Sequence, residues 1–339
     1  MDKTHRRTDI PVLLLHNVDP AWKPAETAVV VDAVEKLKTE LRNEGHSVIG
    51  VPVANESLVQ ILEPYHPDDY IVFNWCEELP GRHRSDSLVA EILEHLNFVY
   101  TGACPRVLAF SWDKAAVKEL LNSCGVPTPT GKVIDTKVIG SWDRFPAIVK
   151  PAWEHCGLGI STDAVVVDRQ ELEARVAFVQ DNLNQPALVE AFIDGRELHV
   201  TLWGNGDIHA LPAAEMDFSA FDSVKDRLCT FDAKFAPGST HYEKIETRIP
   251  ASLDQTQLSC LNRTAIQAYR AMGCRDYARI DLRMENDLFY VLDVNPNADF
   301  SPDTSLVYAA GEAGLSYGAI ASWLVNLAAQ RHPLFSQKT

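Results

Sequence analysis

Carboxylate and amide oxygens are concentrated in one part of the sequence, between residues 277 and 305. Residues 278–284 alternate small or apolar with charged side chains, and residues 288–294 are apolar and rich in β-forming types, which predicts two strands. The polar residues 285–287 between them predict a turn, and the simplest arrangement is an antiparallel hairpin.

Side chains two residues apart lie on the same face of a strand. Arg279 and Asp281 therefore share a face of the first strand, and Asp293 and Asn295 share a face of the second. Two carboxylates, one amide and one guanidinium come together at the end of a sheet, and such oxygen ligands suit Mg²⁺. The alternative is a pair of edge strands with solvated charges, which explains Asp281 alone better than it explains the polar end of the apolar second strand.

Composition limits the classes of partner. The chain has 339 residues, enough for roughly two or three domains with their own cores. A formal net charge of −16 argues against a nucleic-acid partner. No run reaches the ~18 apolar residues that span a membrane, and the first ten residues lack the apolar core of a secretory signal. The seven cysteines lack CxxC spacing, which predicts reduced thiols in a cytoplasmic protein.

The first part of the chain alternates strands with helices, which predicts a small α/β layer with parallel pairing. Ligands of such sheets bind at the carboxyl ends of the strands. These ends carry His16, Asn17 and the polar residues 74–78. The predicted strands are 10–15, 46–51, 70–73 and 98–100, and the helices are 26–42 and 85–96.

The rest of the chain predicts a mixture of helices and shorter strands. Ser111 is a plausible N-cap for a helix that runs to Leu121, and a strand at 147–151 contains Lys150 before a glycine-containing loop. Asn205-Gly206 is a strong hairpin signal. The remaining predicted strands are 160–167, 187–193, 196–203 and 208–213, and the helices are 169–180, 252–272, 305–312 and 317–329.

These motifs resemble a known family. R-I-D at 279–281, D-V-N-P at 293–296, and S-L-V at 305–307 are similar to the C-terminal signature of the ATP-grasp enzymes, most of all to the D-alanine–D-alanine ligases. Residues 73–102 are similar to the segment that leads out of the first lobe in many such proteins, and the order of elements resembles the family over nearly the full length. The resemblance implies an ATP-grasp fold in which an N-terminal parallel α/β lobe (1–105) precedes central (106–186) and C-terminal (187–339) lobes that enclose a nucleotide.

The resemblance implies contacts for the ATP phosphates. Lys114, in S-W-D-K, and Lys150, in V-K-P, match the lysines that reach the phosphates, although either alone could be a solvated residue. The segment from Glu154 to Gly159 resembles the glycine-rich loop that covers the phosphates in the family. Gly157 and Gly159 allow backbone N–H groups to converge on an anion.

The adenosine and lid contacts are also implied by the resemblance. Glu190, Phe192 and Ile193 match the hinge that reads adenine, and Glu197 matches the glutamate that binds ribose. Core packing is an alternative for Phe192, and a partly exposed strand position is an alternative for Glu197. Lys234 matches the lysine of a mobile segment that closes on the phosphates.

The same resemblance assigns the metal and catalytic positions. Asp281, Asp293 and Asn295 match the ligands of two Mg²⁺ ions, for which Mn²⁺ could substitute. Arg279 matches the arginine that stabilises an oxyanion. Ser305 matches the residue that holds the carboxylate of the second substrate, with a plain helix N-cap as the alternative.

The activity that the resemblance implies is phosphoryl transfer from ATP to a carboxylate, followed by attack of an amine on the acyl phosphate. The substrates would be small molecules such as amino acids, and a homodimer would be consistent with similar ligases. The family's glutamate motif after the first strand is absent, and the S-P-G-M turn is replaced by P-N-A-D. We therefore expect a ligase whose substrates are not two D-alanines.

Two other functions fit the same motifs. One is a kinase of the same fold that releases a phosphorylated product, and the other is a non-catalytic nucleotide-binding protein. Arg82 and Arg84 could bind an anionic substrate group, with a solvated loop as the alternative.

Overall fold

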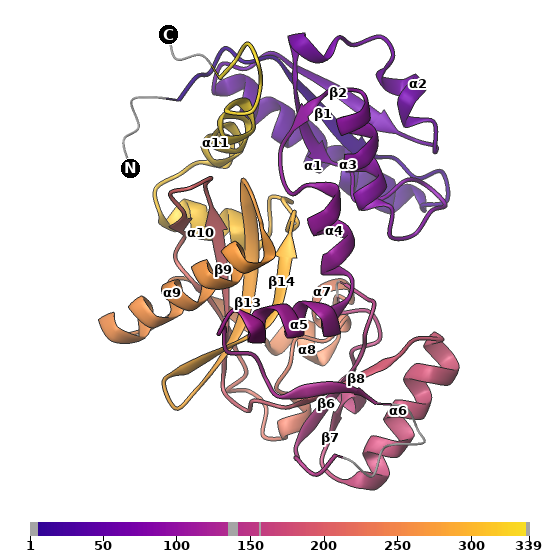
Figure 1. The fold of residues 1–339 in the computed structure, drawn as a ribbon, viewed down its shortest axis with the longest axis vertical. Coiled ribbons are helices and arrows are strands. Elements are labelled where there is room, and N and C mark those ends of the chain that lie inside the picture. Colours follow the sequence, from indigo (N-terminus) through magenta and orange to yellow (C-terminus); the bar gives the residue numbers. More distant parts are fainter. Residues whose placement is uncertain (1–5, 135–141, 156, 337–339) are drawn as a thin grey trace.

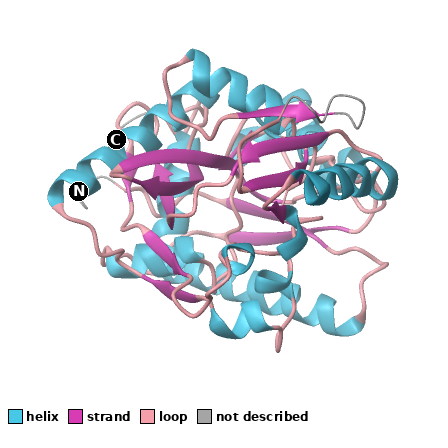
Figure 2. Ribbon diagram, turned by 90° about the horizontal axis from the view of Figure 1, so that it is seen from below, coloured by secondary structure: helices cyan, strands magenta, loops and turns pink. Residues whose placement is uncertain are grey.

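The computed structural model describes residues 6–134, 142–155 and 157–336, whose strands form three sheets (Figure 1). The first sheet lies at one end of the molecule, the small central sheet lies at the other, and the largest sheet lies between them. Figure 2 shows that helices surround the strands in the view from below.

The first lobe is the predicted parallel α/β layer. Its sheet has the order β2-β1-β3-β4, and all its pairs are parallel. Every residue of β1 is buried, because helices cover both faces of the sheet. The elements are β1 (Val12–Asn17), α1 (Pro24–Asn43), β2 (Val48–Val53), α2 (Leu58–Leu62), β3 (Ile71–Trp75), α3 (Asp86–His95) and β4 (Val99–Tyr100).

The central sheet is antiparallel, in the order β5-β8-β6-β7. Helix α6 packs on it through apolar residues that share a core with β6 and β8. Two helices, α4 and α5, lead into this sheet from the first lobe (Figure 1). The elements are α4 (Pro105–Ser111), α5 (Lys114–Ser123), β5 (Gly131–Ile134), β6 (Ala147–Pro151), β7 (Val165–Val166), α6 (Arg169–Leu183) and β8 (Ala187–Ala191).

The largest sheet has the order β12-β11-β9-β13-β14, with β10 paired to β9. Its apolar face packs against α9 and α5. The predicted hairpin at its edge is β13 and β14, which pair antiparallel across a turn at Asn286 and Asp287. The elements are β9 (Arg196–Trp203), β10 (His209–Ala210), β11 (Ala214–Asp217), α7 (Asp232–Phe235), α8 (Thr240–Lys244), β12 (Glu246–Arg248), α9 (Gln255–Met272), β13 (Tyr277–Glu285) and β14 (Leu288–Pro296).

The chain ends back at the first lobe. Helix α10 (Ser305–Glu312) is followed by α11 (Tyr317–Ala329), which packs against α1 and β3, so both ends of the chain lie beside the first sheet (Figure 1). Because α11 buries most of its surface, it is apolar almost all round.

A buried carboxylate joins the first lobe to the largest sheet. Asp276 is fully buried, accepts a hydrogen bond from the backbone N–H of Gly102 at 2.8 Å, and pairs with Arg331 at 2.7 Å. The turn after β14 docks at the same place, where Asn297 accepts from the N–H of Ala103 at 2.7 Å. A Cβ at Gly102 would lie 2.1 Å from the Asn297 amide oxygen, so only glycine allows this approach.

Several local predictions were wrong. Ser111 ends α4, and Asp113 is the N-cap of α5, where its carboxylate accepts from two backbone N–H groups. The predicted strand 160–167 is reduced to β7, because residues 162–164 form a 3₁₀ turn. The predicted strand 208–213 is reduced to β10.

Among the helices of the described residues, none has the length and apolarity that a membrane crossing requires. The cysteines of the described residues are all free thiols.

Candidate functional site

A pocket of about 890 Å³, counting its open mouth, lies where the central sheet meets the largest sheet. It is lined by residues from β6, β8, β9, β13, β14 and the lid, which we define as residues 219–242. Predicted residues that line it are Lys114, Lys150, Glu154, Gly157, Glu190, Phe192, Ile193, Glu197, Lys234, Asp281 and Asp293.

A buried carboxylate lies between two lysines at the base of the pocket. Glu190 pairs with Lys150, whose Nζ lies 2.6 Å from its carboxylate, and with Lys118. Lys118 also donates to the Thr128 hydroxyl at 2.8 Å. Burial opposes the charge on Glu190, but the two lysines outweigh it and hold its pKa at about 2. Lys118 was not predicted. Together with Lys150 it offsets the negative charge of Glu190 in the predicted hinge.

A second residue that was not predicted, Arg283, connects the predicted hinge to Glu197, the predicted ribose-binding residue. Its guanidinium donates to Glu197 Oε2 at 2.9 Å and to the Ile193 carbonyl at 2.7 Å. It also lies 4.5 Å from the centre of the Phe192 ring, within the range of a cation–π interaction. Glu197 is buried. Desolvation opposes its charge, but Arg283 and His199 keep its pKa low, at about 2.

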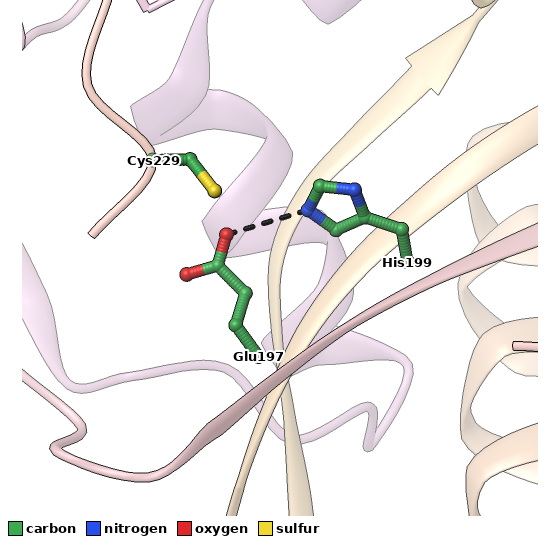
Figure 3. A group of neighbouring side chains, drawn as sticks. All are labelled: Glu197, His199 and Cys229. Carbon is green, nitrogen blue, oxygen red and sulfur yellow. Dashed lines mark hydrogen bonds and ion pairs between the residues drawn. The ribbon is translucent and has the colours of Figure 1, made fainter. Parts of the chain in front are cut away.

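Figure 3 shows that His199 and Cys229 both point toward the carboxylate of Glu197. His199 Nε2 lies 3.3 Å from Glu197 Oε1, and the ligand atoms of the three residues lie within 4.8 Å of one another. This group contains the ligand types of a zinc site. However, Arg283 occupies the other Glu197 oxygen, and burial together with Glu197 raises the pKa of the Cys229 thiol. We therefore assign the group to the wall of this pocket, which all three residues line.

The predicted metal ligands, Asp281, Asp293 and Asn295, lie together on the β13–β14 hairpin. Asp281 is paired in register with Asp293, and Arg279 with Asn295. Asn295 Nδ2 donates to Asp281 Oδ2 at 3.0 Å. These contacts bring the three predicted ligands to one point at the edge of the sheet.

Cations balance both carboxylates. Arg279 Nε lies 2.7 Å from Asp281 Oδ1, and Lys114 Nζ lies 2.6 Å from Asp293 Oδ2. Burial opposes ionisation of both acids, but Arg279 lowers the pKa of Asp281 and Lys114 lowers that of Asp293. Both groups are therefore anionic at neutral pH.

The glycine-rich loop has a left-handed backbone at both of its glycines. Gly157 and Gly159 have φ values of +78° and +74°, while position 156 lies outside the described residues. Glu154 accepts from Arg84 of the first lobe at 2.7 Å and also from Gln185, which precedes β8. His155 and Trp112 make an edge-to-face contact with 4.3 Å between ring centres, and burial lowers the pKa of His155 to about 4.

Of the remaining predicted positions, Lys234 is among the lining residues of this pocket, whereas Ser305, Arg82 and Arg84 are not. Lys234 is exposed on α7 and lines the pocket from the lid. Ser305 is half-buried at the first residue of α10, whose N-cap is Thr304. The plain N-cap interpretation of Ser305 is therefore wrong. Arg84 belongs to the contact between lobes, whereas Arg82 is exposed.

Two acidic residues of the first lobe, Glu77 and Glu78, are held beside the end of β1. Asn17, at the end of β1, accepts from the N–H of Glu77 at 2.8 Å and donates to the carbonyl of Glu78. Glu77 is exposed, but the protein around its carboxylate and, after it, repulsion from Asp299 raise its pKa to about 7.

The chain matches a known family over most of its length. Residues 131–326 match the family described as D-ala D-ala ligase C-terminus. A D-alanine–D-alanine ligase of Syntrophotalea carbinolica is 32% identical over 297 residues, which cover 86% of this chain and 89% of that protein. A D-alanine–D-alanine ligase of Gluconobacter oxydans is 28% identical over 313 residues, 91% of this chain and 96% of that protein. An uncharacterized protein of Sinorhizobium fredii is 31% identical over 88% of each chain.

The fold is similar to that of a solved ligase. The structure of a D-alanine–D-alanine ligase from Bacillus anthracis, complexed with ATP, superposes with a TM-score of 0.71 at 17% identity and covers 94% of this chain and 97% of that chain. At this identity the match shows the ATP-grasp architecture alone, as the sequence motifs predicted.

Proposed function

The chain belongs to the D-alanine–D-alanine ligase family of ATP-grasp enzymes, and from this premise we propose that it joins a carboxylate to an amine through an acyl phosphate. It is an ATP-dependent ligase that forms carbon–nitrogen bonds. The observation that carries the proposed mechanism is the convergence of three lysines and the hairpin carboxylates on one pocket.

Each part of ATP has a matching group in this proposal. Adenine lies beside Phe192, ribose hydroxyls donate to Glu197, and the phosphates bind Lys114, Lys150 and the backbone at Gly157. Lys234 closes on the phosphates from the lid, which excludes water from the acyl phosphate.

The donor set of the hairpin fits Mg²⁺, because it offers two carboxylates and an amide oxygen from adjacent strands. Asp281, Asp293 and Asn295 would hold up to two ions, and Mn²⁺ could replace them. Bound ions would neutralise the charge that develops on the transferred phosphoryl group.

The reaction proceeds in two steps. A carboxylate oxygen of the first substrate attacks the γ-phosphorus, and the bond to ADP breaks. The amine of the second substrate then attacks the acyl carbon, the carbon–oxygen bond breaks, phosphate leaves, and the amine proton passes to solvent or phosphate. Arg279 stabilises the oxyanion of this second step, a type of contact commonly worth about 3–4 kcal/mol, and Ser305 holds the carboxylate of the second substrate.

We propose substrates other than two D-alanines, because the substrate side of the cleft departs from the family. The end of β1 carries Asn17, which is bound to residues 77 and 78. The turn after β14 lacks the family's glycine and docks through Asn297 onto Gly102. We further propose a cytoplasmic enzyme that acts on small molecules, either alone or as a homodimer, which light scattering after gel filtration would test.

The test is phosphate release from Mg-ATP with L- and D-amino acids and small carboxylates, singly and in pairs, with mass detection of products. We expect release that requires a pair and a product lighter than the two substrates by one water. A phosphorylated product from one substrate would instead establish a kinase. Tight ATP binding without release across the panel would favour a non-catalytic binder.

A further inference from the structure

Arg283 connects three elements of the nucleotide pocket. It stands opposite Glu197 in the β13–β9 register and is 2% exposed. Its Nη2 lies 2.8 Å from Glu197 on β9, its Nη1 donates to the Ile193 carbonyl of the hinge at 2.7 Å, and its Nη2 also donates to the Arg227 carbonyl of the lid. One side chain therefore fixes the relative positions of β9, hinge and lid.

Aromatic rings fix the guanidinium in turn. Its carbon lies 4.5 Å from the centre of the Phe192 ring and 5.3 Å from that of Phe218. Phe192 follows β8, and Phe218 follows β11, so the guanidinium is held by rings from both sheets. Such contacts restrict a planar guanidinium more than they would a lysine ammonium.

Both oxygens of the Glu197 carboxylate have a partner that orients them. Arg283 contacts Oε2 of Glu197, and His199 contacts Oε1 at 3.3 Å (Figure 3). An ionised carboxylate has about four lone-pair sites, so Glu197 can accept from ribose hydroxyls while it keeps both partners. Arg283 and His199 therefore keep Glu197 ionised and fix the orientation of its carboxylate before the nucleotide binds.

We propose that Arg283 is the positioning residue of the ribose subsite, and this inference rests on the nucleotide site of the proposed function. Arg283 does not contact the reacting atoms. It presents Glu197 to the ribose hydroxyls and couples that orientation to the docking of the lid through the Arg227 carbonyl. A purely structural ion pair would instead stabilise the fold without affecting how ribose is recognised.

The test compares the binding of ATP, 2′-deoxy-ATP and 3′-deoxy-ATP to the full chain by titration calorimetry, which needs no turnover. A hydrogen bond to a charged group is worth about 1.5–3 kcal/mol, or roughly 10- to 150-fold in affinity. We expect the wild-type protein to prefer ATP over at least one deoxy analogue by about tenfold or more. In Arg283→Met this preference should fall to within about twofold, and in Arg283→Lys, which keeps one donor to Glu197, it should fall part of the way.

A matched control lies on the opposite face of β9. Arg196 binds both oxygens of Glu215 at 2.6 and 2.7 Å and the Ser252 carbonyl at 2.8 Å. Neighbouring residues of a strand point to opposite faces, so Arg196→Met removes a similar ion pair away from the pocket. It should keep the wild-type preference for ATP. If Arg283→Met does not fold, Arg283→Lys decides the question by the same ratio.

The outcomes separate the two proposals. An Arg283 variant that weakens all three nucleotides equally, or a wild-type protein that binds all three alike, would overturn the inference and leave the ligase in place. A wild-type protein that does not bind ATP would overturn both. Loss of the preference in the Arg283 variants, with the preference kept in Arg196→Met, would establish the positioning role.

Discussion

The Nζ of Lys114 lies 2.6 Å from Oδ2 of Asp293, so a proposed phosphate ligand and a proposed metal ligand neutralise each other. Arg279 makes the equivalent contact with Asp281 at 2.7 Å. Both cations reduce the repulsion between two carboxylates that are paired in register on adjacent strands. Binding of a metal and phosphates at this point therefore requires these ion pairs to exchange partners.

Replacement of Lys114 by methionine should reveal the metal site without nucleotide. The variant leaves Asp293 without its cation, so we expect the free energy of unfolding to fall by about 1–2 kcal/mol. Mg²⁺ should then stabilise the variant more than it stabilises the wild-type protein, because the metal binds the carboxylate of Asp293, which has lost Lys114, in the folded state. Urea unfolding with and without Mg²⁺ measures both effects.

Lys225→Met is the matched control for this experiment. Its Nζ lies 2.6 Å from Glu171 in a more exposed pair, so the loss should stay below about 1 kcal/mol and should not depend on Mg²⁺. An equal response of the wild-type protein and Lys114→Met to Mg²⁺ would argue against Asp293 as a metal ligand.

Replacement of Lys118 by methionine should cost more, because Lys118 and Glu190 are both buried. We expect a loss of about 3 kcal/mol at pH 7, since Lys150 is then the one cation among the described residues that pairs with Glu190. Lys150 and Lys118 hold the pKa of Glu190 at about 2 against the cost of burial. The stabilisation is therefore complete above the ordinary carboxyl pKa near 4.5 and is lost as pH falls toward 2.

The difference between Lys118→Met and the wild-type protein should consequently narrow at pH 3. Urea unfolding at pH 7 and pH 3 measures it, with the exposed pair of Lys225 again as the control. A difference that is the same at both pH values would show that the loss comes from packing and from the Thr128 contact, and not from the charge of Glu190.

Local signals were sufficient for the hairpin and for the charged face that it presents. Alternation in residues 278–284 placed Arg279 and Asp281 on one face, and their 2.7 Å contact confirms it. The polar turn at Asn286 and Asp287 has positive φ values, as Asn and Asp tolerate. These features depend on residues close in sequence, so a pattern could predict them.

Features that depend on distant partners were missed. Lys118 follows Lys114 by one helical turn, which places both on one face of α5, but its burial is decided by Glu190 on β8. Arg283 follows Asp281 on the same face of β13, yet its role is decided by pairing with β9. The spacing of both residues was visible in the sequence. It did not identify Glu190 as the partner of Lys118 or Glu197 as the partner of Arg283.

Arg84 should matter to the site, and Arg82 should not. Arg84 donates to Glu154 of the glycine-rich loop at 2.7 Å, and its guanidinium lies 5.4 Å from the centre of the Trp112 ring. Arg84→Met releases the glycine-rich loop from the first lobe, and we expect the KM for ATP to rise about three- to tenfold, because a partly exposed charged hydrogen bond is lost. The exposed neighbour gives the comparison, since Arg82→Met should change the KM by less than about twofold. Equal effects of the two changes would contradict the contact between lobes as the cause.

Replacement of Glu77 by glutamine should stabilise the protein above neutral pH. Desolvation by the surrounding protein, followed by repulsion from Asp299, raises the pKa of Glu77 from its usual 4.5 to about 7. The folded state therefore holds more protons than the unfolded state between these values, and stability falls as pH rises through this window. Glu77→Gln removes the charge, so it should be more stable than the wild-type protein at pH 8 and equal to it below pH 4.5. Urea unfolding across this range checks the prediction, and Glu63→Gln, on the surface of the first lobe, should show no such difference. A Glu77 variant that is no more stable at pH 8 would mean that the carboxylate is well solvated in the folded protein.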